Sequence, residues 1–103
     1  MPLFMVKKEV YGWLKEGKKS IDVRKGNLRE GDIAVFQCGA NYLHFRIVRK
    51  ETGKLDEVIT AENYKQVIPT AENQQAALDY LRGIYGESSS VFTAYYLANP
   101  KSN

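Results

Sequence analysis

The stretch Gly17-Lys18-Lys19-Ser20-Ile21-Asp22-Val23-Arg24 changes from helical to strand periodicity and carries four charges. Before it, Val10, Trp13 and Leu14 recur at three- and four-residue spacing, as on one face of a helix. Gly17 stands where a helix would end in a left-handed residue. The sequence therefore predicts a helix that stops at Gly17, with Trp13 packed in the core rather than free to stack on a base.

Beyond Gly17 the hydrophobic period is two, as in a strand with one buried face. Ile21 and Val23 are expected in the core, which turns Ser20, Asp22 and Arg24 together onto the opposite face. A core strand rarely has so polar a second face, although an edge strand can simply expose such a face to water. The polar face of this strand is therefore a candidate site.

Basic residues gather at the junction between this helix and this strand. Lys18 and Lys19 follow the helix end, where cations complement the negative end of the dipole. From the junction, Lys19 can reach the side that carries Asp22 and Arg24. Two cations and one anion in a small patch suit a polar ligand with donors and acceptors, such as a nucleobase or a nucleotide.

The length predicts one domain, and the charge is compatible with a phosphate-bearing partner. The chain has 103 residues, of which 44% are hydrophobic, so residues 1–103 are expected to form a single domain with one modest core. Lys and Arg number 15 against 12 Asp and Glu, which makes the chain weakly basic. The excess of cations lies between Lys7 and Lys25, around the polar strand.

The sequence gives no support for a metal-binding, cofactor-binding or membrane protein. Cys38 is the only cysteine and His44 the only histidine, so there is no material for an internal disulfide or a zinc cluster, and we expect no cofactor. No stretch approaches the roughly 20 apolar residues of a membrane span, and the first residues lack the order of a signal peptide. We therefore expect a cytoplasmic protein that does not bind membranes.

The pattern of the remaining sequence predicts further strands and a predominantly helical region. The region from Lys50 to Tyr85 is expected to be predominantly helical, with Thr70 as the N-cap of its last helix, Glu72 in the first turn and Gly86 after the end. Strands are predicted at Leu3 to Val6, Ile33 to Phe36, Tyr42 to Arg49 and Val91 to Leu97.

The pattern Gly17-x-Lys19-x-x-Asp22-x-Arg24 resembles the signature G-x-K-x-x-E-x-R of ASCH domains, relatives of the PUA fold, with Asp22 in place of the usual Glu. The order of elements is similar to that of small prokaryotic single-domain ASCH proteins over nearly the whole chain. The resemblance implies an α+β fold: a small PUA-like β-barrel of about five to six strands, with flanking helices and a helical insertion before the last strand.

The resemblance also implies a cleft between barrel and helices that holds RNA or a (modified) nucleoside or nucleotide. Arg46 could face the ligand or water, and Tyr95 could stack on a base or pack in the core. The residues expected to bind the ligand are Lys18, Lys19, Ser20, Asp22, Arg24, Arg46 and Tyr95.

Two other functions remain open. Some bacterial ASCH proteins are acetylcytidine amidohydrolases, so this chain could be a small hydrolase of an acylated nucleoside with Lys19, Asp22 and Glu72 as catalytic residues, or a nuclease. However, the position of that group's catalytic threonine is Asp22 here, and a carboxylate cannot act as a hydroxyl nucleophile. The third possibility is an interaction domain with a vestigial cleft.

Overall fold

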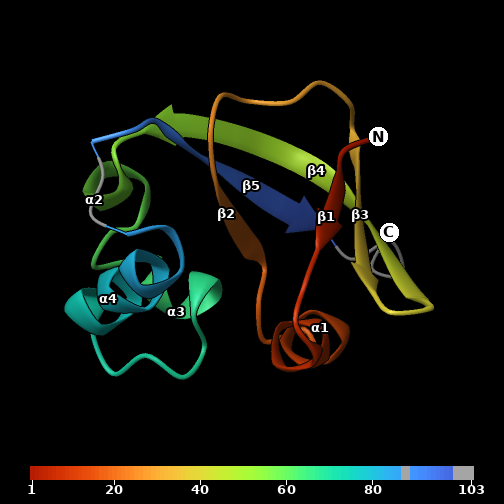
Figure 1. The fold of residues 1–103 in the computed structure, drawn as a ribbon, viewed down its shortest axis with the longest axis horizontal. Coiled ribbons are helices and arrows are strands. Elements are labelled where there is room, and N and C mark those ends of the chain that lie inside the picture. Colours follow the sequence, from red (N-terminus) through yellow and green to blue (C-terminus); the bar gives the residue numbers. More distant parts are fainter. Residues whose placement is uncertain (87–88, 99–103) are drawn as a thin grey trace.

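The computed structural model describes residues 1–86 and 89–98 of the chain (Figure 1). Five strands form one sheet with helices around it, which confirms the predicted α+β class and the helical insertion before the last strand. The elements are β1 (Leu3–Met5), α1 (Lys8–Lys15), β2 (Ile21–Lys25), β3 (Ile33–Cys38), β4 (Asn41–Gly53), α2 (Leu55–Val58), α3 (Tyr64–Val67), α4 (Gln74–Tyr85) and β5 (Phe92–Ala98).

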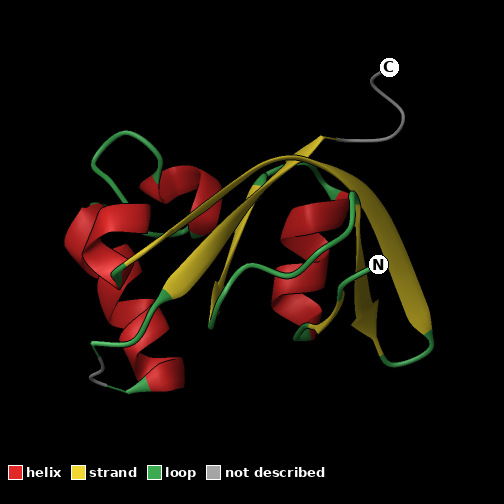
Figure 2. Cartoon of the chain, turned by 90° about the horizontal axis from the view of Figure 1, so that it is seen from above, coloured by secondary structure: helices red, strands yellow, loops and turns green. Residues whose placement is uncertain are grey.

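The sheet has the order β1-β3-β4-β5-β2, so β1 and β2 are its two edge strands. β1 runs parallel to β3, and all other neighbours are antiparallel. The 13-residue strand β4 pairs with β3 and then with β5, and its register shifts between Ile47 and Arg49. A bulge of this kind bends a strand and increases its twist. The sheet consequently curls into a half barrel, in which β4 arches over the molecule (Figures 1 and 2).

Arginine side chains connect the two edge strands of the half barrel. Arg24 in β2 donates from Nη1 to the carbonyl of Met5 at 3.2 Å, and Arg29 in the following loop donates to the carbonyl of Leu3 at 3.3 Å. Both guanidinium groups also lie over the ring of Phe4, at 4.7 and 5.1 Å from its centroid. Arg24 therefore connects β2 to β1 through side-chain contacts.

Helix α1 ends as the sequence predicts. Gly17 has a φ of 79°, and the N–H groups of Lys18 and Lys19 both donate to the carbonyl of Trp13, at 2.9 and 3.1 Å. Both bonds satisfy the carbonyl group of Trp13, one of those that a helix end otherwise leaves unpaired. The stop at Gly17 turns the chain from α1 into β2 and places Lys19 just before that strand.

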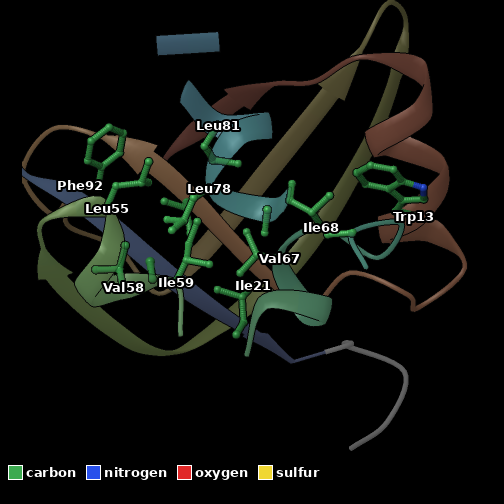
Figure 3. Packing of buried hydrophobic residues seen from close by; sticks show 14 residues of the cluster. Trp13, Ile21, Leu55, Val58, Ile59, Val67, Ile68, Leu78, Leu81 and Phe92 are labelled. Atoms are coloured by element: carbon green, nitrogen blue, oxygen red, sulfur yellow. The ribbon is translucent and has the colours of Figure 1, made fainter. Parts of the chain in front are cut away.

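Two clusters of buried side chains lie on the two faces of the sheet. The first lies between the sheet and helices α2, α3 and α4, and it contains Trp13, Ile21 and Val23 as predicted (Figure 3). The second fills the inside of the half barrel. Its buried members are Phe4, Leu14, Ala34, Phe36, Phe45, Ile47 and Tyr95.

Two local predictions are wrong. The strand expected to end at Arg49 continues as β4 to Gly53, because β5 pairs with it as far as Gly53 and Phe92. The N-cap of α4 is Asn73 rather than Thr70, since the Asn73 side chain accepts the N–H of Ala76 at 2.8 Å. Glu72 consequently precedes the helix instead of lying in its first turn.

Candidate functional site

A cavity of about 160 Å³ lies between β2, helices α1 and α4 and the end of β1. Its floor is buried, because Lys19 and Asp22 are only 5% and 3% exposed. Its rim reaches solvent at Met5 and Ile84, which are 61% and 52% exposed. A cavity of roughly 150 Å³ in an apolar core accommodates one benzene molecule. This cavity therefore has room for one aromatic ring.

Lys19 is held on the floor of the cavity by the backbone of two elements. Its Nζ donates to the carbonyl of Ile21 at 2.8 Å and to that of Val67 at 2.6 Å, and it lies 4.0 Å from Oδ1 of Asp22. Val67 is the last residue of α3, where carbonyl groups have no partner within the helix. Lys19 therefore connects β2 to α3, and most of its donor capacity is used by the fold.

The environment of Lys19 changes its acidity. Burial disfavours the charged amine and lowers its pKa to about 8; the carboxylate of Asp22 opposes this shift, and Arg24 adds to it. A neutral amine retains enough N–H groups for the carbonyls of Ile21 and Val67. Deprotonation of Lys19 is therefore compatible with the observed hydrogen bonds.

Asp22 and Arg24 form a two-pronged ion pair beside Lys19. Nε of Arg24 donates to Oδ2 of Asp22 at 2.6 Å, and Nη2 donates to Oδ1 at 3.4 Å. Burial lowers the pKa of Arg24, but the charge and the hydrogen bonds of Asp22, together with the hydroxyl of Tyr85, outweigh burial and raise it. Arg24 consequently stays charged, with donor groups left after those that Asp22 and Met5 accept.

Aromatic side chains line the cavity beside this polar floor. Trp13 comes from α1 and Tyr80 and Tyr85 from α4, with the rings of Trp13 and Tyr80 6.1 Å apart. The hydroxyl oxygen of Tyr80 is buried and has no hydrogen-bond partner among residues 1–86 and 89–98. The sequence analysis missed Tyr80. Its position one turn before Ile84, on the apolar side of a predicted helix, was the only available signal.

The structure brings together three of the predicted site residues, Lys19, Asp22 and Arg24, and all three line the cavity. Lys18 is exposed, 3.3 Å from the carboxylate of Glu16, and it borders a second depression with Trp13, Lys65, Gln66, Pro69 and Thr70. Ser20 is half-buried, and its N–H donates to the carbonyl of Gln66. Neither Lys18 nor Ser20 lines the cavity that the described residues form.

The remaining predicted site residues lie elsewhere. Arg46 is exposed on β4, and Glu72 is exposed before α4. Tyr95 is 1% exposed inside the half barrel, where its ring lies 5.1 Å from that of Phe4 and its hydroxyl accepts the N–H of Arg29 at 3.0 Å. Of the two roles considered for Tyr95, this geometry favours packing over base stacking.

The described residues give no indication of a metal site or a membrane span. No group of three or more His, Cys, Asp or Glu side chains in residues 1–86 and 89–98 could hold a metal ion. In the same part of the chain, every helix is too short or too polar to cross a bilayer.

Comparison with known proteins supports the fold and gives no information on a ligand. No protein-family model matches this sequence, and neither does any curated protein. Among solved structures, the crystal structure of hypothetical protein PH0355 is similar, with a TM-score of 0.75 and 18% sequence identity over 94% of this chain and 97% of that chain. At this identity the similarity shows that the two chains share a small mixed half-barrel fold.

Proposed function

We propose that this chain is a PUA-like domain of the ASCH type, and that its cavity binds one base of RNA or of a (modified) nucleoside or nucleotide. The observation that carries the proposal is the combination of a ring-sized volume, aromatic walls and the buried polar floor of Lys19, Asp22 and Arg24. A purely apolar cavity of this size suits a hydrocarbon ring. Charged groups on the floor instead favour a ring with hydrogen-bonding edges.

The volume also limits which part of a nucleotide can enter. Because the cavity holds one ring, the ribose and the phosphate would lie at the rim. Lys7 is exposed at this rim, between β1 and α1, and its ammonium group can attract a phosphate. The base would thus be enclosed while the backbone stays in solvent, which is the usual mode of single-stranded RNA recognition.

The second depression supports RNA over a free nucleoside. Trp13 borders both the cavity and this depression, which also carries Lys18 and Lys65. A strand with one base in the cavity could continue past Trp13 towards these two cations. Basic grooves with aromatic residues are typical of proteins that bind single-stranded nucleic acid.

The proposal can be tested by titrating cytidine, uridine, guanosine and a short single-stranded RNA into wild type and two arginine variants. Arg24→Lys keeps the charge but removes the planar fork at the cavity. Arg49→Lys is the matched control, because Arg49 also pairs with an acid two residues away, Glu51, and also lies over an aromatic ring, Tyr96. We expect weaker binding for Arg24→Lys and unchanged binding for Arg49→Lys. Equal loss in both variants, or no binding by wild type, would refute the proposal.

A second pair of measurements separates RNA from nucleoside ligands. Replacing Lys18 and Lys65 by Ala removes the cations of the second depression without touching the cavity. If RNA is the ligand, this double variant should bind the oligonucleotide more weakly and the nucleoside as wild type does. If both ligands bind it as well as wild type, the ligand is a free nucleoside or nucleotide.

One observation favours hydrolysis as a second candidate function. A lysine general base must be neutral, and Lys19 has its pKa lowered to about 8. Against this role, its Nζ is bound to the carbonyls of Ile21 and Val67, and Asp22, at the threonine position of the hydrolases, is paired with Arg24. An assay for deacetylation of acetylcytidine decides the matter. Turnover that rises with pH through about 8 and disappears in a folded Lys19→Met variant would show hydrolysis.

A further inference from the structure

Two arginine side chains border the outer edge of β1. This strand pairs only with β3, and the carbonyls of Leu3 and Met5, about 7 Å apart along the strand, face the other edge. Arg29 donates to the first of these carbonyls and Arg24 to the second. Both guanidinium groups also lie over the ring of Phe4, at 4.7 and 5.1 Å from its centroid, so their carbons are at most about 10 Å apart. The two cations are therefore neighbours along this edge.

The loop between β2 and β3 holds Arg29 in place through its backbone (Figure 1). The N–H of Arg29 donates to the buried hydroxyl of Tyr95 at 3.0 Å, and its carbonyl accepts from Nζ of Lys50 at 2.7 Å. Among the described residues, its side chain makes one hydrogen bond, the 3.3 Å bond to Leu3. A guanidinium group has five N–H donors, so four of those on Arg29 remain available. A substitution of this side chain keeps the backbone bonds that position the loop.

The positive charge at this edge is only partly balanced by acids. Asp22 pairs with Arg24, but no carboxylate of residues 1–86 and 89–98 lies within 4.0 Å of Arg29. Glu30 and Asp32 belong to the same loop; both are exposed, and neither forms an ion pair in this part of the chain. Two guanidinium groups and one carboxylate leave a net positive charge, which attracts an anion.

The donors that remain on the two arginines suit a phosphate group. Three N–H groups of Arg24 go to Asp22 and Met5, and the hydroxyl of Tyr85 lies beside the guanidinium group and helps to raise its pKa. Arg24 thus keeps at least one donor, and Arg29 keeps four. Phosphate oxygens point in several directions and accept readily from arginine, whereas a carboxylate is planar. A phosphate can consequently bridge two guanidinium groups that stand apart.

We infer that Arg24 and Arg29 bind a phosphate group at the outer edge of β1, beside the proposed base-binding cavity. Arg24 and Met5 line this cavity, so a phosphate at the edge is next to a base inside it. This inference rests on the proposed function and deepens it. The ligand is then a phosphate ester, either a nucleotide or RNA, rather than an unphosphorylated nucleoside.

The test measures how much a phosphate adds to the affinity for one nucleoside. Uridine, uridine monophosphate and the dinucleotide uridylyl-uridine are titrated into wild type, Arg29→Gln and Arg49→Gln. Arg29→Gln removes the charge and the planar fork but keeps the backbone bonds of the loop. Arg49→Gln is the matched control, because it removes the same charge from an arginine that also lies over an aromatic ring, at 5.2 Å from the centroid of Tyr96.

Wild type is expected to bind at least one of the two phosphate esters about tenfold more tightly than uridine. Arg29→Gln should lose this gain, bind uridine as wild type does and melt close to the temperature of wild type. Arg49→Gln should match wild type with all three compounds. A gain that depends on Arg29 and is larger with the monophosphate identifies a nucleotide as the ligand, and one that is larger with the dinucleotide identifies RNA.

Three results would overturn the inference while the proposed function stands. Wild type could bind uridine without any gain from a phosphate, Arg29→Gln could keep the gain, or Arg49→Gln could lose it as well. If Arg29→Gln weakens uridine as much as the phosphate esters, Arg29 serves the loop and the inference is again wrong.

Inorganic phosphate tests the anion site without a base. If wild type binds none of the three uridine compounds, the proposed function fails. A rise in the melting temperature of wild type with inorganic phosphate, absent in Arg29→Gln and present in Arg49→Gln, would then still support the anion site. An equal rise in all three proteins, or no rise in any, would refute that site as well.

Discussion

The buried amine of Lys19 predicts that the protein becomes more stable as the pH is raised from about 8 towards 10.5. In this window the folded protein has released the proton of Lys19, because burial lowers the pKa of the amine to about 8. The unfolded chain, with Lys19 in water, still binds that proton. Unfolding therefore takes up a proton, and raising the pH removes protons from the unfolded state and favours folding.

The two pKa values set the size of the effect. The difference between 10.5 in the unfolded chain and about 8 in the fold corresponds to about 3 kcal/mol in the free energy of unfolding. The free energy of unfolding begins to rise near pH 8 and stops rising near pH 10.5. Below pH 8 the folded protein carries the full cost of a buried charge. Tyrosines and other lysines titrate in the same range, so wild type alone cannot isolate Lys19.

A Lys19→Met variant provides the reference. Met keeps the apolar length of the side chain and removes the titrating group, while the other lysines and tyrosines remain in both proteins. We expect the stability of wild type relative to Lys19→Met, measured by urea unfolding at several pH values, to rise by up to about 3 kcal/mol between pH 8 and 10.5. A difference that stays flat with pH would show that Lys19 keeps an ordinary pKa in the fold, and one that falls would show that the fold raises this pKa. Either result would show that the burial argument is wrong.

Four further substitutions test the fold. Asn73→Ala should lower the free energy of unfolding by about 1 kcal/mol, because it removes the N-cap of α4. Thr70→Ala, at the N-cap position predicted from the sequence, should change this free energy little. Chemical denaturation measures both effects. Gly17→Ala should cost about 1 kcal/mol through backbone strain at a φ of 79°, since no atom would block the added methyl group, and its melting temperature reports this. Phe36→Ala should cost about 3 to 5 kcal/mol in urea unfolding, because Phe36 is fully buried inside the half barrel.

The sequence predicts the fold well where a local rule decides it. The end of α1 follows from Gly17, and the alternation at Ile21 and Val23 places β2 against the helices correctly. Long-range pairing decides the elements that were misplaced. β4 continues beyond Arg49 because β5 lies beside it, and no property of the segment from Lys50 to Gly53 alone indicates a strand.

The residues of the candidate site also divide into those that a local rule places and those that tertiary packing places. Asp22 and Arg24 are two residues apart on β2, so strand periodicity suffices to place them together, and Lys19 joins them from the junction before the strand. Tyr80 reaches the same cavity only because α4 packs beside α1, which is a tertiary relationship between distant segments. Its spacing predicts a buried position, but a sequence does not tell whether a buried hydroxyl will find a partner.

The residues of the signature-like stretch have structural roles that do not depend on a ligand. Gly17 ends α1, Lys19 joins β2 to α3, and Arg24 pairs with Asp22 and connects the edge strands β1 and β2. Any loss of binding after substitution of Lys19 can thus reflect a damaged fold as easily as a lost ligand contact. Loss of binding at the signature residues is therefore evidence for a ligand only where the variant keeps the stability of wild type.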